Sequence, residues 1–337
     1  MFGRPRLAIL TCSLLLSTAC ATHLPERWPS YAPNPSWKAL ADQAVAEYTA
    51  QGVSYKPYLQ DYTVSGDWLN SSRDTWTESE HLHFDPDGVP MVSYSGTFYY
   101  NPVTVAEFAF TMYGRYIRGT LSDSDAFLRA VNRLLLLQDG LGALRYPFPW
   151  NYYLAEQPFE SGWASAMAQG LGLSAFARAY DLTRNPKYLE AGGHALSFLL
   201  TSAAAGGVTD SMSDLDQSLS QQIVFEEYVV HPASHTLNGF MFTLLGLYDW
   251  ESMPTSTAQI ARRAFWRGID TLVNILPYYD IGGFTAYDMS HITYNRQPHI
   301  GVHYHAVHIY LLHALGSVTH DVRLAKYEEL WASYVPQ

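Results

Sequence analysis

The stretch GWASAMAQGLGLSAFARAYDLTRNPKYLEAGGHALSFLL, residues 162–200, carries the pattern that decides the fold. It predicts one helix over 162–180 and a second helix over 186–200, which begins at Pro186. The tight turn Thr183-Arg184-Asn185-Pro186 separates them. Because so short a turn folds the second helix back along the first, the stretch predicts an antiparallel helical hairpin.

The same pattern recurs along the chain, and we interpret it as an internal repeat with a period of about 65 residues. The other expected helix pairs are 103–118 with 123–137, 236–248 with 255–276, and 304–315 with 321–334. Stacked in order, these hairpins predict an all-α dominated fold, an incomplete α/α toroid that occupies residues 98–337.

Residues 35–97 are expected to form an extension before the helical domain. Residues 36–51 have helical spacing, whereas 52–100 hold short alternating runs between Gly, Ser, Asp and Pro, which predict β-hairpins and loops.

The first 34 residues are interpreted as an address and a tether. Residues 1–19 combine arginines, a short apolar run and small residues, which is the layout of a bacterial secretory signal. The residues before Cys20 resemble a lipobox, so we expect Cys20 to be lipidated and the proline-rich residues 20–34 to form a tether. This predicts a protein anchored in the bacterial cell envelope, at the periplasmic face of the outer membrane. Ordinary signal cleavage, which gives a secreted or periplasmic form, is the alternative.

Composition limits the possible partners. The formal net charge of -11 argues against nucleic acid, because phosphate binding needs basic surface. The cysteines, Cys12 and Cys20, both lie in the signal region, so no internal disulfide or cysteine nucleophile is expected. Aromatic residues make up 15% of the chain and include 25 tyrosines, which favours a carbohydrate-contacting surface. Packing between helices accounts for many of these rings.

The long connections between the hairpins, 138–161, 201–235 and 277–303, are expected to converge on one face of the scaffold and form a functional cleft. The second contains Glu226-Glu227-Tyr228. Burial of one carboxylate beside aromatic rings would raise its pKa and make it a proton carrier near neutral pH. A solvated acidic pair at a helix start is the structural alternative.

Several segments, taken in order, resemble the C-terminal catalytic domain of the D-glucuronyl C5-epimerases, which act on heparosan and heparan sulfate. They are 162–170, 226–228, 237–241, 246–249, 287–288 and 304–309. The resemblance covers about residues 98–335 and implies an α/α toroid, in agreement with the repeat. It implies catalytic roles for Glu227, Tyr228, Tyr287 and Tyr304.

The resemblance and the loop contents also suggest substrate-binding residues. Asn238 matches the asparagine of the family's Leu-Asn-Gly motif, and His291 matches a histidine whose motif has Ser290 in place of the family's arginine. The further expected contacts are Arg145, Trp150, Trp163, Arg296 and His305. The residue that holds the substrate carboxylate stays open among His291, Arg296, Arg145 and Asn238.

Epimerisation at C5 removes the proton next to the uronate carboxylate and returns one to the other face, which requires two proton carriers. We expect Glu227 and Tyr304 to be this pair. The expected partner is an acidic polysaccharide that contains glucuronate, and a homodimer is possible. No cofactor is expected, because no glycine-rich nucleotide-binding turn is found.

Three other interpretations remain open. A uronate polysaccharide lyase begins with the same proton abstraction. His303, His305 and His308 have a spacing that could hold a metal ion, although His305 and His308 also match the epimerase motif, so no metal site is expected. A glycan-binding lipoprotein without catalytic activity would keep the aromatic residues and would not need Glu227.

Overall fold

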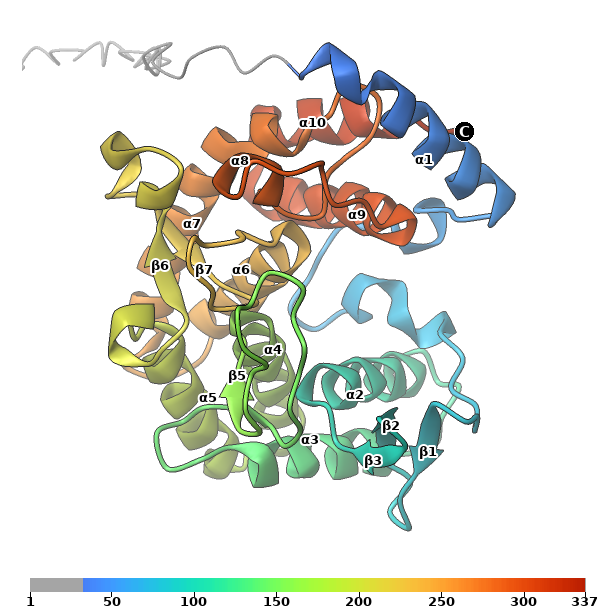
Figure 1. Ribbon diagram of the computed structural model, residues 1–337. Coiled ribbons are helices and arrows are strands. Elements are labelled where there is room, and N and C mark those ends of the chain that lie inside the picture. The colour runs from blue at the N-terminus through green and yellow to red at the C-terminus, as the bar shows by residue number, and fades with distance from the viewer. Residues whose placement is uncertain (1–32, 337) are drawn as a thin grey trace, which may run out of the picture. The chain divides into compact units, whose positions relative to one another are not determined.

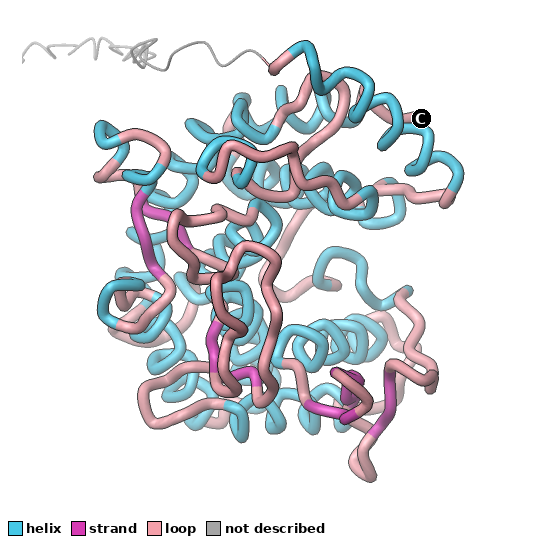
Figure 2. The backbone as a smooth tube through the Cα atoms, in the orientation of Figure 1, coloured by secondary structure: helices cyan, strands magenta, loops and turns pink. Residues whose placement is uncertain are grey.

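Helices dominate residues 33–336, the part of the chain that the computed structural model of the protein describes (Figures 1 and 2). The helix-dominated fold class is thereby confirmed. The expected signal peptide (1–19) and the lipidation site Cys20 lie outside the described residues, as does most of the tether (20–34), so these stay predictions. No described helix is long and apolar enough to cross a membrane.

The long helices pair as the repeat predicts. The pairs are α2 (Pro102–Ile117) with α3 (Asp125–Leu137), α4 (Ala166–Thr183) with α5 (Pro186–Leu199), α6 (Leu237–Glu251) with α7 (Ala258–Tyr279), and α9 (Val302–Thr319) with α10 (Val322–Ala332). Asn101, Asn185 and Asp321 cap α2, α5 and α10, because their side chains accept hydrogen bonds from first-turn N–H groups.

One helix of each pair lies in an inner layer. Helix α4 packs against both α2 and α6, and α6 packs against α9, while α3, α5, α7 and α10 lie outside them. The inner helices α4 and α6 are buried along almost their whole length, whereas α3 buries the single apolar face that contains Phe127 and Leu134. The closure of these layers into an incomplete toroid stays a prediction.

Helix α4 begins later than its sequence pattern predicts. Trp163–Ala164 form strand β5, which pairs antiparallel with β4 (Arg145–Tyr146), and Ser165 is the N-cap of the helix. Pairing with β4 therefore places the Trp163 ring on a short two-stranded ribbon that directly precedes the N-terminus of α4. This ribbon belongs to the first long connection.

The other two long connections also contain short elements. Strands β6 (Thr209–Ser211) and β7 (Ile223–Phe225) pair antiparallel in the second, beside the 3-10 turns η4 (Ala203–Ala205), η5 (Met212–Asp214) and η6 (Gln217–Leu219). The third contains the single turn α8 (Ser290–Thr293). Each long connection leads into the N-terminus of an inner helix, α4, α6 or α9, which places their residues near one end of that layer.

Residues 33–101 contain the expected helix and hairpins and belong to the same compact unit as the helix pairs. Their elements are η1 (Pro35–Trp37), α1 (Lys38–Ala50), η2 (Lys56–Tyr58), η3 (Trp68–Arg73) and an antiparallel sheet of β1 (Leu82–Phe84), β2 (Pro90–Tyr94) and β3 (Thr97–Tyr99). In the register, Val92 lies opposite Leu82 and Tyr99. This segment is anchored on the inner layer through Trp68, whose ring stacks on Phe110 of α2 at 4.1 Å between centroids.

Candidate active site

A cavity of about 310 Å³ lies at the first turns of α2, α4, α6 and α9, which contribute Val103, Met167, Asn238 and Tyr304 to its lining. The other lining residues are Tyr94, Asn101, Glu107, Tyr146, Phe148, Trp150, Trp163, Glu227, Tyr228, Phe242, Val307 and Tyr310. Helix N-termini carry partial positive charge, so this arrangement favours an anionic ligand.

Stacked aromatic rings form one wall of the cavity. The Trp163 ring stacks on Tyr146 at 3.8 Å between centroids, and the Phe148 ring stacks on Tyr94 of β2 at 3.7 Å. The Trp150 ring meets Tyr94 edge-on. Trp150 and Trp163 thus both line the cavity, on a rigid apolar surface, and their contact with a substrate stays a prediction.

The two adjacent carboxylates, Glu226 and Glu227, lie in different surroundings. Glu226 is buried and points away from the cavity, where Oε1 lies 2.6 Å from Nδ1 of His235 and Oε2 accepts a hydrogen bond from the His235 backbone N–H. This pairing fixes the loop that precedes α6. Glu227 lines the cavity with only 7% of its surface exposed.

Burial raises the pKa of Glu227 to about 7, although hydrogen bonding with Tyr228 and Tyr287 lowers it in part. Its Oε2 is buried and has no hydrogen-bond partner among the described residues. The carboxyl lies against the first turn of α6, since a Cβ added to Gly239 would fall 2.3 Å from Oε2. Glu227 therefore has the environment of a proton carrier that works near neutral pH.

Three tyrosines surround the Glu227 carboxyl. Tyr287 is 5% exposed and lies behind Tyr304, with 4.4 Å between the ring centroids, whereas Tyr304 is 38% exposed and lines the cavity. Burial raises the pKa of Tyr304 to about 12 and those of Tyr228 and Tyr287 well above 10. All three hydroxyls are therefore protonated at neutral pH, and Tyr304 can donate a proton into the cavity.

Some polar atoms of the cavity wall have no partner in the described chain. Nε1 of Trp150 and Oδ1 of Asn238 are both buried without a hydrogen bond there. A buried polar group without a partner is costly, so these atoms are available to hydrogen-bond with a ligand. Asn238 thus lines the cavity with an open acceptor, and its substrate-binding role stays a prediction.

Four other expected contacts lie outside the cavity lining. Arg145 extends along the ribbon, where Nε donates to Asp139 at 2.8 Å and Nη1 donates to the Gly162 carbonyl at 3.1 Å. The exposed Arg296 lies over the Tyr153 ring, 5.4 Å from its centroid. The structure therefore does not bring either guanidinium to the Glu227 carboxyl.

The two expected histidines are buried behind the site. Nε2 of His291 lies 3.0 Å from the Tyr278 carbonyl oxygen. His305 has Nδ1 2.9 Å from Oγ1 of Thr285 and Nε2 3.1 Å from the Trp331 carbonyl oxygen, and burial lowers its pKa to about 3. Both rings support the third long connection instead of lining the cavity.

The histidine spacing that suggested a metal ion does not assemble a ligand set. His308 shares Thr285 with His305, while His303 is exposed on α9. Within residues 33–336, no three groups of the kind that bind metals are gathered at one point.

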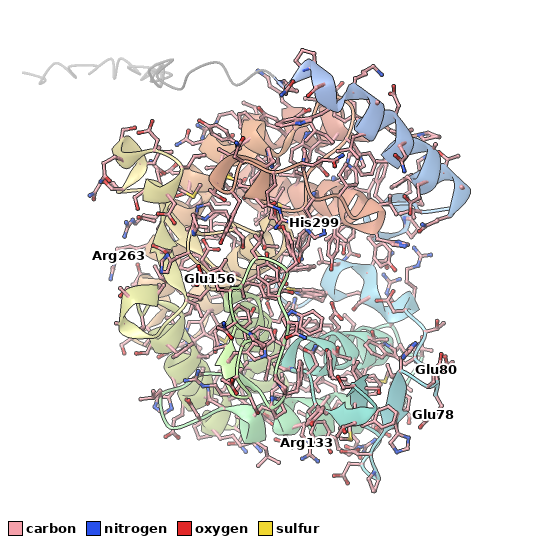
Figure 3. The ribbon with its side chains drawn as sticks, in the orientation of Figure 1. Glu78, Glu80, Arg133, Glu156, Arg263 and His299 are labelled. Carbon is pink, nitrogen blue, oxygen red and sulfur yellow. The ribbon has the colours of Figure 1, made fainter. Side chains whose placement is uncertain are left out.

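A further network supports Tyr287 from behind. The neighbouring Asp288 is fully buried and accepts hydrogen bonds from the Tyr153 hydroxyl and the Ser290 backbone N–H. Burial opposes its ionisation, yet these bonds and His299 hold the pKa of Asp288 below its usual range. His299, labelled in Figure 3, also packs its ring against Tyr287 at 5.1 Å between centroids.

Glu107 is a cavity residue that the sequence analysis missed. It lies on α2, and burial together with the nearby Asp74 raises its pKa to about 7. The helical pattern of 102–117 marks apolar positions and gave no sign that the side chain at 107 faces an open cavity. Its role becomes visible only in the folded protein, where Glu107 lies close to other carboxyl groups.

A helix-pair scaffold with two protonatable carboxyls, Glu107 and Glu227, in an aromatic cavity has the features of an enzyme active site. Residues 138–333 match the family model described as D-glucuronyl C5-epimerase C-terminus. The chain belongs to this family, which is a family of epimerases.

Known proteins of similar sequence include a "D-glucuronyl C5-epimerase" of Caenorhabditis elegans, 33% identical over 222 residues. That match covers 63% of this chain and 35% of the relative. A second relative is an uncharacterized protein of Methanocaldococcus jannaschii, 26% identical over 187 residues, which cover 56% of each chain. The chain thus matches about a third and about half of the lengths of these relatives.

Proposed function

We propose that the protein inverts C5 of D-glucuronate residues to give L-iduronate within an acidic, heparosan-like polysaccharide. The observation that carries this proposal is Glu227, a carboxyl with its pKa raised to about 7 in an aromatic cavity. Membership of an epimerase family supports the reaction class. The C. elegans relative that carries the glucuronyl epimerase name supports glucuronate as the sugar.

In the proposed reaction, the ionised Glu227 removes the C5 proton from one face of the sugar. The C5–H bond breaks, and its electron pair moves into the C5–C6 bond and the carboxylate, which gives an enediolate-like state. The Tyr304 hydroxyl then donates its proton to C5 from the opposite face. Water returns a proton to Tyr304 and takes one from Glu227, so no external oxidant or reductant is needed.

The neighbouring tyrosines have supporting roles. Tyr228 and Tyr287 hydrogen-bond with the Glu227 carboxyl, which keeps the ionised form accessible despite burial. Tyr287 also hydrogen-bonds with Tyr304 and lowers its pKa in part. The unpartnered Asn238 is suited to a sugar hydroxyl or the carboxylate.

The direct test is incubation with glucuronate polymers in deuterated water. We expect deuterium at C5 and new iduronate residues, with no change in chain length. A lyase would give a 4,5-unsaturated end that absorbs in the ultraviolet and shorter chains, and a binding module would retain the polymer unchanged. Either result would contradict the proposal.

Two variants test the proton carriers. Glu227→Gln keeps the shape of the side chain but removes the base, so we expect a rate loss of about a hundredfold or more. Tyr304→Phe should cause a similar loss. Glu251→Gln, at the C-terminal end of α6, is the matched control and should retain the wild-type rate. If both site variants epimerise at that rate, Tyr287 and Tyr228 become the pair to test.

We also propose that Cys20 anchors the protein in the bacterial cell envelope, on the sequence grounds given above. In a bacterial host, labelled palmitate should be incorporated into the wild-type protein and not into Cys20→Ser. Quantitative release of an unlabelled wild-type protein would contradict the anchor.

A further inference from the structure

The bound uronate would bring a carboxylate into a cavity that offers it no cationic side chain. The residues that line this cavity, all in the described part of the chain, include neither Arg, Lys nor His. Arg145 and Arg296 point to other partners, and Glu227 would repel a second negative charge. Another group must therefore receive the carboxylate.

Besides the amide of Asn238, the cavity offers Glu107, whose chemistry fits this need when it carries a proton. Its side chain lies in the cavity lining, opposite no basic group, and its carboxyl takes part in no hydrogen bond within the described residues. A neutral carboxylic acid has one O–H donor, and an O–H to carboxylate hydrogen bond is among the strong ones. An ionised Glu107 would repel the same ligand.

The groups that face Glu107 are acidic or phenolic on every side. Asp74 and Tyr58 approach it from the segment before β1, Tyr304 and Tyr310 from α9, and Glu227 and Tyr146 from the long connections. Burial and the Asp74 charge together favour the protonated form and raise the pKa of Glu107 to about 7.

We propose that the neutral form of Glu107 holds the carboxylate of the bound uronate through a hydrogen bond from its hydroxyl group. The site therefore accepts the sugar anion together with one proton. This inference rests on the proposed function for the identity of the ligand. When the C5 proton leaves and negative charge grows on the carboxylate, the same hydrogen bond becomes stronger and stabilises the enediolate-like state.

The proposal fixes the direction of the pH dependence. Glu107 is protonated below a pH of about 7, so uronate binding should be strong there and weaken by about tenfold for each pH unit above it. Catalysis also needs Glu227 ionised, so the productive enzyme carries one proton on this pair of carboxyls. The two apparent pKa values of a bell-shaped rate profile then belong to the pair.

The test measures binding without turnover. In a Glu227→Gln background, calorimetry follows a glucuronate-containing heparosan oligosaccharide between pH 6 and 8.5, beside the same oligosaccharide with its carboxyl groups reduced to alcohols. We expect affinity for the acidic chain to fall by about tenfold per pH unit above 7 and affinity for the reduced chain to stay constant. Because Glu227 no longer titrates in this background, the fall reports on Glu107.

Two variants assign the effect to Glu107. Glu107→Gln keeps an N–H donor that does not titrate, so the fall in affinity above pH 7 should disappear. Glu107→Asp keeps a titrating carboxyl, so the fall should persist. Glu251→Gln is the control, because Glu251 is a partly buried carboxyl outside the cavity lining and burial also raises its pKa. This variant should leave the fall in affinity above pH 7 unchanged.

An unchanged fall in Glu107→Gln would overturn the proposal, as would loss of binding at every pH, because the amide N–H should replace the hydroxyl donor. An equal pH dependence of the affinity for the oligosaccharide with reduced carboxyl groups would also overturn the proposal. The outcome is separate from the fate of the proposed reaction. A wild-type protein that exchanges no deuterium at C5 would contradict the epimerase, whereas this measurement would still decide how a uronate carboxylate is held.

Discussion

At the scale of single residues, the site depends on how the Glu227 carboxyl is positioned. Glu226 is tied to His235, which turns the next side chain in the opposite direction, towards the cavity. Glu227 then fits against α6 only because residue 239 has no side chain. Gly239 is therefore a positioning residue, although it has no chemistry of its own.

We expect Gly239→Ala to reduce kcat by at least about tenfold, because the new Cβ would meet Oε2 of Glu227 at 2.3 Å and its Cβ at 2.7 Å. Gly193→Ala on α5 is the matched control, since nothing lies within 4 Å of its Cβ position. Measured rates and melting temperatures of both variants check this. Equal rates for Gly239→Ala and the control would contradict the close fit.

Burial of Glu227 also links stability to pH. The native protein keeps a proton on Glu227 up to about pH 7, whereas the unfolded chain loses it near the usual value of 4.5. The native state thus binds more protons than the unfolded chain between these values. The contribution of Glu227 to the free energy of unfolding therefore falls as pH rises through this window.

We therefore expect Glu227→Gln to be more stable than wild type at pH 8, by up to about 3 kcal/mol, and close to it at pH 4.5. Urea unfolding at both pH values measures this difference. If the variant were more stable than wild type by the same amount at both pH values, ionisation of Glu227 would not be the cause of the difference.

At the scale of elements, the contact between α4 and α6 sets the spacing of the inner layer. A Cβ on Gly246 would lie 2.1 Å from the Gly170 carbonyl oxygen, and one on Gly170 would lie 2.5 Å from Cα of Thr243. The backbones touch there, and a fully buried ion pair, Nη1 of Arg178 to Oδ2 of Asp249 at 2.5 Å, joins the same helices further along. This contact positions Met167 and Asn238 at the cavity.

We expect Gly246→Ala to lower the free energy of unfolding by about 1–3 kcal/mol or more, because a methyl group cannot enter a backbone contact without separating the helices. Gly193→Ala serves again as the control and should be neutral or slightly stabilising, since alanine is the better helix former. Denaturant unfolding of both variants measures the difference. A stabilised Gly246→Ala would mean that α4 and α6 are further apart.

At the scale of the described molecule, residues 33–101 act as part of the helical core. The Tyr62 hydroxyl donates to Oδ2 of Asp249 at 2.7 Å, within the buried pair that joins α4 and α6, and the Tyr62 backbone N–H donates to Ser317 at the end of α9. One segment thereby connects three inner helices. Tyr94 and Asn101, from the end of the same segment, complete the cavity wall.

We expect Tyr62→Phe to cost about 1–3 kcal/mol of unfolding free energy, since Asp249 would lose a donor in a fully buried position. Tyr116→Phe is the control, because no hydrogen bond involves the Tyr116 hydroxyl within the described residues. Hydrogen exchange should show residues 33–101 and the inner helices opening together. Independent opening of this segment in the wild type would contradict a shared core.

Much of this arrangement was predictable from local patterns in the sequence. Apolar spacing and short turns act over a few residues, so the helix pairs were predicted close to their observed bounds. The motif around Glu226 and Glu227 marked the right loop, but two adjacent carboxylates look alike in a sequence. The partner His235 and the gap at Gly239 distinguish them.

Only the tertiary structure decided which side chains share the cavity. Arg145, His291 and His305 are polar residues of the expected segments, yet each finds a hydrogen-bond partner outside the cavity, because a side chain bonds what packing brings within about 3 Å. Arg296 lies over the Tyr153 ring instead. Glu107 lies on a helix 120 positions away from Glu227 along the chain and enters the same cavity because α2 and α6 both pack on α4. Burial, and with it the pKa of each carboxyl, depends on such long-range packing, whereas the helices that create it are encoded locally.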